Sequence, residues 1–213
     1  MPDPASVWAI IVAGGSGARF GEPKHRQILG GKEVWRHSFD TLQAAGIGGV
    51  VVVGDVPDGV PAGEHRGASV LSGLNTVPES VEWVLVHDAA RPLLTIELIE
   101  RVLQRASVGD VDGVIPAIPV PDTLKRVSGE DVLATLDRAD LVAAQTPQAF
   151  RVAVLRAAFD VAQGEWTDDA SLVENTVGGT VVHVMGDAAN LKITYSQDLA
   201  IAEARLNASK SDG

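Results

Sequence analysis

The stretch WAIIVAGGSGARFGEPK, residues Trp8 to Lys24, decides the fold. It opens with a short apolar run, Trp8 to Val12, of the kind that forms a strand buried on both faces. Three glycines follow: Gly14, Gly15 and Gly17. They permit a tight turn and leave backbone N–H groups free to face a phosphate, and Arg19 and Lys24 add two positive charges. The pattern predicts a strand that ends in a polyphosphate-binding loop.

Two other interpretations of this loop are an ordinary strand-to-helix turn and a dinucleotide-binding fingerprint. The fingerprint requires a third glycine where this chain has Phe20, and an acidic residue about 20 positions later, whereas Asp55 lies further on. The Walker pattern is missing as well, because no Gly-Lys-Ser/Thr occurs. A nicotinamide-dependent oxidoreductase is therefore disfavoured, and nucleotide triphosphate chemistry is favoured.

Composition narrows the class of protein. The chain has 213 residues, of which 46% are hydrophobic, with a formal net charge of −11. That charge disfavours a sequence-independent nucleic-acid binder, which needs a Lys/Arg surface. The sequence contains no cysteine, so disulfides, thiolate nucleophiles and cysteine-ligated metals are excluded. We find no signal peptide and no apolar run near 18 residues, and we expect a cytoplasmic protein without a membrane partner.

Strand-like and helix-like runs alternate along the chain, which predicts an α/β fold: a Rossmann-like, mostly parallel sheet with helices on both faces. The expected strands after the first are 50–53, 83–86, 114–118 and 180–184. The expected helices are 33–45, 96–106, 150–163, 168–177 and 197–207. Gly46, Thr95 and Ser196 are suited to end or begin helices, and Asp168 is read as a helix cap rather than a catalytic acid.

One segment interrupts the alternation. From Pro121 to Gln145 the sequence indicates a β-hairpin that turns at Ser128–Asp131, with Thr123, Lys125 and Val127 on one face. A two-stranded hairpin is too small to be stable alone, so this arm needs a surface to pack on. We expect one domain over residues 1–213, with the arm at about 121–145.

Three further motifs carry charged residues at the predicted carboxyl edge of the sheet or near it. In VHDAARP, Asp88 follows a strand and can ligate a divalent cation, while Arg91 can meet phosphate or pair with Asp88. In HRGASVLSGL, Arg66 and Ser69 can contact a base or a phosphate, or Ser69 can simply cap a helix. In NLKIT, Lys192 either extends to solvent or points into a site. The remaining histidines are scattered and give no metal-ligand spacing: His25, His37, His87 and His183.

In this order, the motifs AGGSGAR…PK, RGASVLSGL, VHDAARP, PDTLK…LDR and TPQAF…TDDAS…NLKIT resemble the 2-C-methyl-D-erythritol 4-phosphate cytidylyltransferase family. The resemblance spans residues 8–206 and implies a fold like that of the nucleotide-diphospho-sugar transferases. It implies transfer of CMP from CTP to methylerythritol phosphate, with release of pyrophosphate and use of Mg²⁺. It also implies a homodimer in which the arm reaches the partner, so that Thr123 and Arg138 serve the partner's site.

The resemblance assigns a role to each matching residue. The expected catalytic residues are Arg19, Lys24, Arg138 and Lys192, and the expected magnesium ligand is Asp88. CTP would be held by Ala13, Gly14, Gly15, Gly17, Gly63, Ser69 and Ala89. The sugar-alcohol phosphate would be positioned by Thr123, Arg138 and Lys192. The alternatives are a ribitol 5-phosphate cytidylyltransferase, which no residue here distinguishes, and a CTP-binding module without turnover.

The residues agree with that chemistry. A phosphate monoester has a second pKa of about 6, so the attacking group is already anionic at pH 7 and needs no general base. Three features depart from the family pattern: the Arg19–Lys24 spacing is short, His25 follows Lys24, and the crossover from Gly54 to Gly67 is much shorter than usual. The short crossover lies beside the expected cytosine pocket and bears on base specificity.

Overall fold

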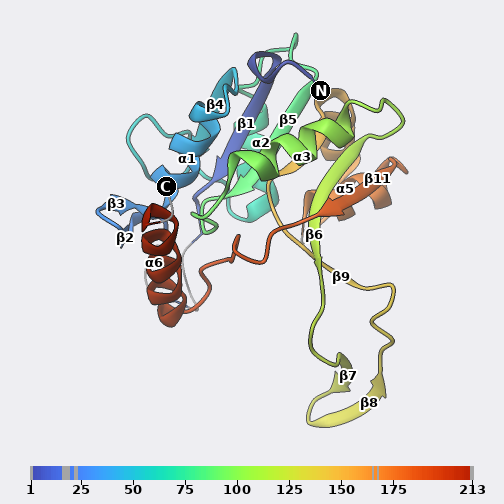
Figure 1. Cartoon of the computed structure of the whole chain (residues 1–213). Helices are drawn as coiled ribbons and strands as arrows, with labels where there is room; N and C mark the ends of the chain where they lie inside the picture. Colours follow the sequence, from blue (N-terminus) through green and yellow to red (C-terminus); the bar gives the residue numbers. More distant parts are fainter. Residues whose placement is uncertain (1, 16–19, 22–23, 165, 167, 212–213) are drawn as a thin grey trace.

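The apolar run near the start of the chain forms β1, Val7–Val12, which lies between two parallel neighbours, β4 (Gly49–Val53) and β5 (Trp83–Asp88). Figure 1 shows the computed structural model, which describes residues 2–15, 20–21, 24–164, 166 and 168–211. Gly17 and Arg19, two residues of the predicted phosphate loop, lie outside the described residues.

The rest of the sheet extends from β5 in the order β10, β6, β11. Its strands are β6 (Gly113–Pro119), β10 (Gln148–Arg151) and β11 (Val181–Met185), with β9 (Val142–Ala144) paired to the end of β6. β11 is parallel to β6, whereas β10 is antiparallel to both β5 and β6. The predicted mostly parallel α/β sheet is therefore confirmed, with one antiparallel strand inserted in it.

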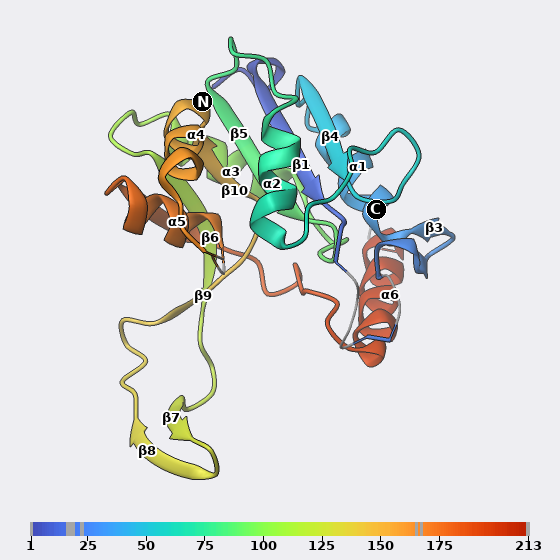
Figure 2. The same cartoon turned by 180° about the vertical axis from the view of Figure 1, so that it is seen from behind.

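Helices cover both faces of the sheet because successive side chains of β1 point in opposite directions. Val7, Ala9 and Ile11 pack with α1 and α3, whereas Ile10 packs with α2, α4 and α5 (Figures 1 and 2). The helices are α1 (Val34–Ala44), α2 (Arg66–Leu74), α3 (Ile96–Ala106), α4 (Val152–Val161) and α5 (Asp169–Thr176). The last helix, α6 (Ser196–Ser211), lies beside a small hairpin of β2 (Ile28–Leu29) and β3 (Lys32–Glu33).

Several helix boundaries are confirmed by their caps. Thr95 Oγ1 accepts a hydrogen bond from the Leu98 N–H at the start of α3. Asp168 Oδ1 accepts one from the Ser171 N–H at the start of α5. Gly46 follows α1 with φ +77°, a left-handed conformation that glycine adopts without strain.

Several helix boundaries were predicted wrongly. The last helix, expected at 197–207, begins at Ser196 and ends at Ser211. The helix expected at Phe150–Gln163 begins only at Val152 and ends at Val161, because Phe150 belongs to β10, whose neighbours on both sides take up its backbone groups. The helix expected from Glu33 begins one residue later, and Glu33 pairs with Ile28 in the β2–β3 hairpin.

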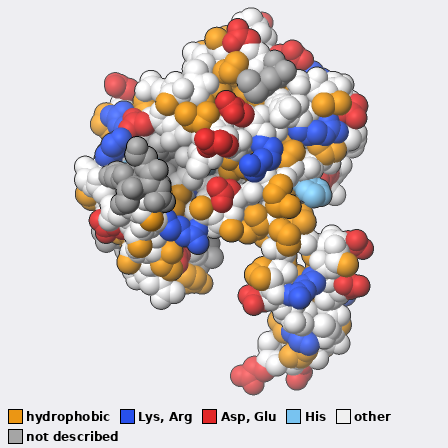
Figure 3. Space-filling view, in the orientation of Figure 1, with side chains coloured by type: hydrophobic (Ala, Val, Ile, Leu, Met, Phe, Trp, Pro, Cys, Tyr) orange, Lys and Arg blue, Asp and Glu red, His pale blue; other side chains and the backbone are white. Residues whose placement is uncertain are grey.

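The arm projects away from the body of the molecule in both cartoon views (Figures 1 and 2). Its strands, β7 (Lys125–Ser128) and β8 (Asp131–Thr135), pair antiparallel around Gly129 and Glu130, as the sequence predicts. Every residue of both strands is exposed, including Val127, Val132 and Leu133. Figure 3 shows hydrophobic side chains on the surface of the arm and where it joins the body. Within the described part of the chain, these three apolar side chains are not covered.

In the part of the chain that the structure describes, no helix combines the length and the apolar character needed to cross a bilayer.

Candidate active site

A cleft of about 470 Å³ opens where β1 and β5 end, at the carboxyl edge of the parallel strands. Ligands of open α/β sheets bind at this edge. Nine predicted site residues line the cleft: Ala13, Gly14, Gly15, Lys24, Gly63, Ser69, Asp88, Ala89 and Lys192. Residues from the two ends of the sequence therefore meet in one place.

The wall beside β1 is built by close backbone approach. A Cβ atom on Gly14 would lie 2.4 Å from the Ala62 side chain and 3.3 Å from Ser69 Oγ, so only glycine fits there. The Gly63 N–H donates to Ser69 Oγ at 3.1 Å, and Ser69 Oγ donates to the His65 carbonyl. Ser69 thus lies within α2 and holds the 62–63 loop in place.

The cap of α2 is a residue that the sequence did not indicate. His65 precedes the helix, and its Nδ1 accepts a hydrogen bond from the Ala68 N–H at 3.2 Å. The interpretation of Ser69 as a helix cap is therefore wrong.

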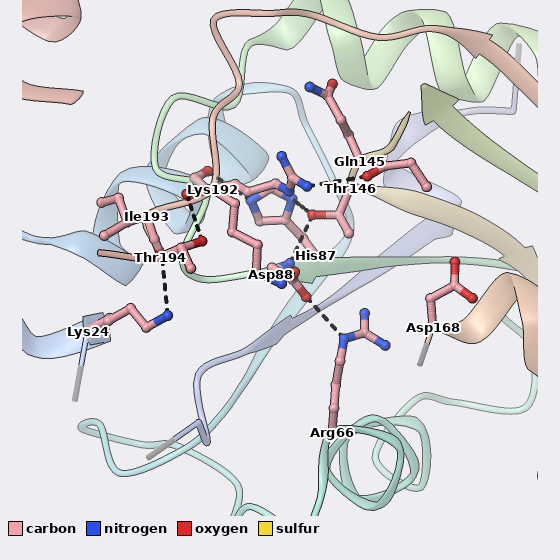
Figure 4. Close-up of polar contacts among 12 residues, drawn as sticks. Lys24, Arg66, His87, Asp88, Gln145, Thr146, Asp168, Lys192, Ile193 and Thr194 are labelled. Atoms are coloured by element: carbon pink, nitrogen blue, oxygen red, sulfur yellow. Dashed lines mark hydrogen bonds and ion pairs between the residues drawn. The ribbon is translucent and has the colours of Figure 1, made fainter. Parts of the chain in front are cut away.

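The floor of the cleft is an alternating chain of charges (Figure 4). Asp88, the last residue of β5, accepts from Arg66 Nε at 3.1 Å on Oδ1 and from Lys192 Nζ at 2.6 Å on Oδ2. Burial by itself raises the pKa of Asp88, but Arg66 and Lys192 outweigh it and hold that pKa well below its usual range. Asp88 is therefore a carboxylate at neutral pH.

Arg66 is held on its other side by Asp169, whose Oδ2 lies 2.8 Å from Arg66 NH1. Asp169 is 2% exposed, and burial raises its pKa even though Arg66 lowers it. The sequence analysis did not select Asp169. Its only signal was a second acidic residue after the predicted cap Asp168.

Lys24 approaches from the opposite wall. It lies in a short 3₁₀ helix, Lys24–Arg26, and its Nζ donates to the Ile193 carbonyl at 3.2 Å. Lys192, the residue before Ile193, binds Asp88, so both lysines meet the same C-terminal segment (Figure 4).

Arg91, which the sequence offered as a partner for Asp88 or phosphate, instead binds backbone. Its NH1 donates to the Asn190 carbonyl at 2.7 Å and its NH2 to the Ala144 carbonyl at 3.4 Å. Among the described contacts, the Arg91 side chain makes no hydrogen bond or ion pair with Asp88, whereas the Arg91 backbone N–H donates to the Asp88 carbonyl at 2.9 Å. Arg91 therefore ties the loop after β5 to two distant segments.

Thr123 and Arg138, which the sequence also placed at the site, do not line this cleft. Both lie in the exposed arm, and the guanidinium of Arg138 donates to the Pro121 carbonyl. The arm extends away from the body of the molecule (Figure 2), and no residue of 121–145 lines the cleft. The fold of a single chain therefore does not bring these two residues to the other site residues.

The residues partly fit the implied magnesium ion. Within the described ranges, no group of three or more His, Cys, Asp or Glu side chains could hold a metal alone. Mg²⁺ usually takes one or two carboxylates together with substrate phosphates and water. Asp88 supplies one ionised carboxylate on the floor of the cleft, so the donor set fits a cation that enters with a polyphosphate.

Comparison with known proteins points to one family. A family model for 2-C-methyl-D-erythritol 4-phosphate cytidylyltransferase (IspD) matches residues 7–208. The Rubrobacter xylanophilus protein of that name is 41% identical over 96% of each chain. The Azoarcus sp. protein of the same name is 42% identical over 94% of each chain.

Solved structures give the same result. The cytidylyltransferase of that name from Thermus thermophilus matches with a TM-score of 0.78 and 32% identity, over 93% of this chain and 98% of the other. The 4-diphosphocytidyl-2C-methyl-D-erythritol synthase from Anaerococcus prevotii matches with a TM-score of 0.81 and 28% identity, over 96% of this chain and 100% of the other. The chain belongs to the 2-C-methyl-D-erythritol 4-phosphate cytidylyltransferase family.

Proposed function

We propose that this protein joins CTP and 2-C-methyl-D-erythritol 4-phosphate to give 4-diphosphocytidyl-2-C-methyl-D-erythritol and pyrophosphate. An oxygen of the acceptor phosphate attacks the α-phosphorus of CTP, and the bond from that phosphorus to the bridging oxygen of the β-phosphate breaks. The observation that carries the proposal is the group of cations around the cleft: Lys24 and Lys192 meet at the segment 192–193, and Arg66 adjoins them through Asp88.

Electrostatic stabilisation is the main work of this site. The acceptor phosphate is mostly dianionic at neutral pH, so no side chain has to remove a proton from it. Negative charge instead grows on the oxygens around the α-phosphorus and on the departing pyrophosphate. We propose that Lys24 and Arg19 contact the α-phosphate, because both residues follow the glycine turn in the sequence.

Lys192 has a second role in this proposal. In the protein alone its charge is balanced by Asp88 at 2.6 Å, which keeps both groups in fixed positions. When an anionic acceptor enters, Lys192 can turn its ammonium to the phosphate, because its side chain is 40% exposed. A divalent cation held by Asp88 and the triphosphate would neutralise charge on the leaving pyrophosphate.

The nucleoside is proposed to lie against the wall made by Gly14, Gly63 and Ser69. Here the backbone is close enough to offer peptide N–H and C=O groups to a base edge, since Gly14 and Gly63 have no room for a side chain. Ser69 Oγ already fixes the Gly63 N–H, so the loop is held before a ligand arrives.

We also propose that the arm completes a homodimer. Its two strands are wholly exposed and carry Val127, Val132 and Leu133, which need an apolar surface. An arm that crosses to a second subunit would bury them and bring Thr123 and Arg138 toward the partner's cleft.

A single assay tests the function. The protein is mixed with CTP, methylerythritol phosphate and Mg²⁺, and pyrophosphate release is measured. We expect turnover that requires all three. Turnover with ribitol 5-phosphate in place of methylerythritol phosphate would move the assignment to that acceptor. If the protein binds CTP but releases no pyrophosphate with either acceptor, it is a CTP-binding module without turnover.

A further inference from the structure

His87 lies next to Asp88 in β5 but faces away from the cleft, into the interior. It is 0% exposed, and both of its ring nitrogens have hydrogen-bond partners. Nδ1 lies 3.0 Å from Thr146 Oγ1, while Nε2 lies 3.0 Å from Ser38 Oγ and 3.1 Å from the Arg91 carbonyl. A buried imidazole with this many partners has a defined orientation.

The partners fix which nitrogen carries the proton. The Asp88 N–H donates to Thr146 Oγ1 at 3.1 Å, so the hydroxyl hydrogen of Thr146 is free to donate onward to His87 Nδ1. On the other side, Ser38 Oγ donates to the Arg91 carbonyl at 3.1 Å and can accept from His87 Nε2. Every group has a partner when the hydrogen bonds run in one direction, from Thr146 through His87 to Ser38 and Arg91. In that arrangement His87 is neutral, accepts at Nδ1 and donates from Nε2–H.

This chain of hydrogen bonds joins both ends of the Asp88–Arg91 turn. It begins at the Asp88 amide and ends at the Arg91 carbonyl, with His87 in the middle. The turn also positions Ala89 and Ala90, which line the cleft.

Thr146 extends the chain to the segment that carries Lys192. Asn190 Nδ2 donates to the Thr146 carbonyl at 2.8 Å, and the Asn190 carbonyl accepts from Arg91 at 2.7 Å. The Ile193 N–H then donates to the Ala90 carbonyl at 2.8 Å. Three segments far apart in sequence are therefore connected beneath the Asp88–Lys192 pair (Figure 4).

We propose that His87 is a positioning residue for the nucleotidyl transfer: through Thr146 it fixes the Asp88 backbone and the segment that places Lys192. Electrostatic catalysis depends on charges that are held in place before the reaction, and supporting partners behind the reacting groups maintain that placement. At metal sites, where the effect is known, loss of a residue that supports a ligand lowers metal affinity or activity by about 10–100-fold.

Replacing His87 by Asn or by Gln tests separately the hydrogen bond to Thr146 and the hydrogen bonds to Ser38 and Arg91. In His87→Asn the amide oxygen replaces Nδ1 and can accept from Thr146, but the side chain is too short to reach Ser38. In His87→Gln the amide replaces Nε2 and can donate to Ser38 or Arg91, but the acceptor for Thr146 is lost. If His87 acts through Thr146, the Asn variant keeps more activity than the Gln variant, although Gln is the longer side chain.

The experiment measures kcat and KM for CTP in both variants, with thermal melting beside them. We expect His87→Gln to lose about 10–100-fold in kcat with little change in KM for CTP, and His87→Asn to keep most of the kcat. Thr146→Val should reproduce the loss and Thr146→Ser should restore it. Equal losses in both His87 variants, in step with their melting temperatures, would show that His87 is merely part of the core.

A second measurement needs no variant to fold. The ¹⁵N NMR spectrum of the imidazole in the intact protein should show His87 neutral at pH 7, with the proton on Nε2. A proton on Nδ1 would overturn the proposal. The role of His87 rests on the proposed function. If the unaltered protein releases no pyrophosphate, that function fails. If the unaltered protein is active and the Thr146 and His87 variants have the same kcat as it does, only this inference is overturned.

Discussion

Lys192 Nζ lies 2.6 Å from Oδ2 of Asp88, across 104 positions of sequence. The pair joins the end of a buried strand to a segment just before the last helix. Because Arg66 binds the other oxygen of Asp88, this single carboxylate lies between two cations. Asp169 in turn balances Arg66, so the four charges of the cleft floor cancel, and Lys24 adds a positive charge beside them of the sign that a polyphosphate requires.

Removing a cation from the cleft should lower turnover much more than stability. For Lys24→Ala and for Lys192→Ala we expect kcat to fall on the order of 10²–10³-fold, because each residue stabilises charge that develops at the phosphorus. Pyrophosphate release measures the effect. Lys32→Ala is the matched control, since Lys32 pairs with Asp40 at the surface. Near-normal rates for Lys24→Ala would remove its proposed role.

Subunit mixing tests whether the arm acts on a partner. Arg138→Ala and Lys192→Ala are each expected to be inactive alone. If Arg138 serves the other subunit, a mixed dimer contains one intact cleft, and an equal mixture recovers about a quarter of the wild-type sites. If Arg138 acts within its own chain, every cleft in the mixture lacks one residue and activity does not return.

The exposed arm residues provide a separate test of the dimer. Leu133→Glu places a charge on a side chain that is 60% exposed in the single chain, so folding should be unaffected. In a dimer the same charge would be buried without a partner, which is strongly unfavourable. We expect sedimentation velocity to show a shift from dimer to monomer. A wild-type protein that sediments as a monomer at all concentrations would contradict the dimer.

The glycine wall predicts a stability difference between neighbouring positions. Gly14→Ala should destabilise the protein by about 1–3 kcal/mol, because its Cβ would overlap the Ala62 side chain. Gly15→Ala has open space around its Cβ and should change the free energy of unfolding by less than about 0.5 kcal/mol. Urea denaturation measures both, and the double variant Gly14→Ala/Ala62→Gly should recover most of the loss.

Stability should fall as the pH drops below about 6.5, the unfolded pKa of histidine. Burial lowers the pKa of His87 to about 4, despite the opposing charge of Asp88, so the unfolded chain binds this proton more readily than the folded protein. Between these two values the linked loss amounts to about 3 kcal/mol. Burial lowers the pKa of His25 as well, which adds a change of the same sign.

Urea denaturation between pH 7 and pH 4.5 measures this dependence. His87→Gln should flatten the curve, whatever its stability at pH 7, because glutamine does not titrate. A curve of unchanged slope in that variant would assign the pH dependence to other groups.

Much of the fold could be predicted because its signals are local. The apolar run of β1, the Thr95 cap of α3 and Gly46 after α1 each act within a few residues. β10 escaped prediction because its four residues run directly into α4, and its strand conformation depends on β5 and β6 on either side. The inserted antiparallel strand is therefore a property of the assembled sheet.

Some residues of the candidate site likewise have a local signal in the sequence, and others have none. The glycine turn and Asp88 could be found because each directly follows an apolar strand. The link from Arg66 to Asp169 spans 103 positions and has no local signal. The sequence gives His87 no metal-ligand spacing, and its hydrogen-bond partners, Thr146 and Ser38, come from other segments.

The fastening of Asp88, Ala90 and Arg91 to residues 190–193 has a consequence for protein synthesis. A ribosome adds Lys192, which balances Asp88, only after the last strand of the sheet, β11, is complete. A chain cut short by a premature stop codon after β11 would keep every strand of the main sheet, yet Asp88 would lose Lys192 and Arg91 would lose the Asn190 carbonyl. Such a fragment would lack part of the charge arrangement on which the proposed catalysis depends.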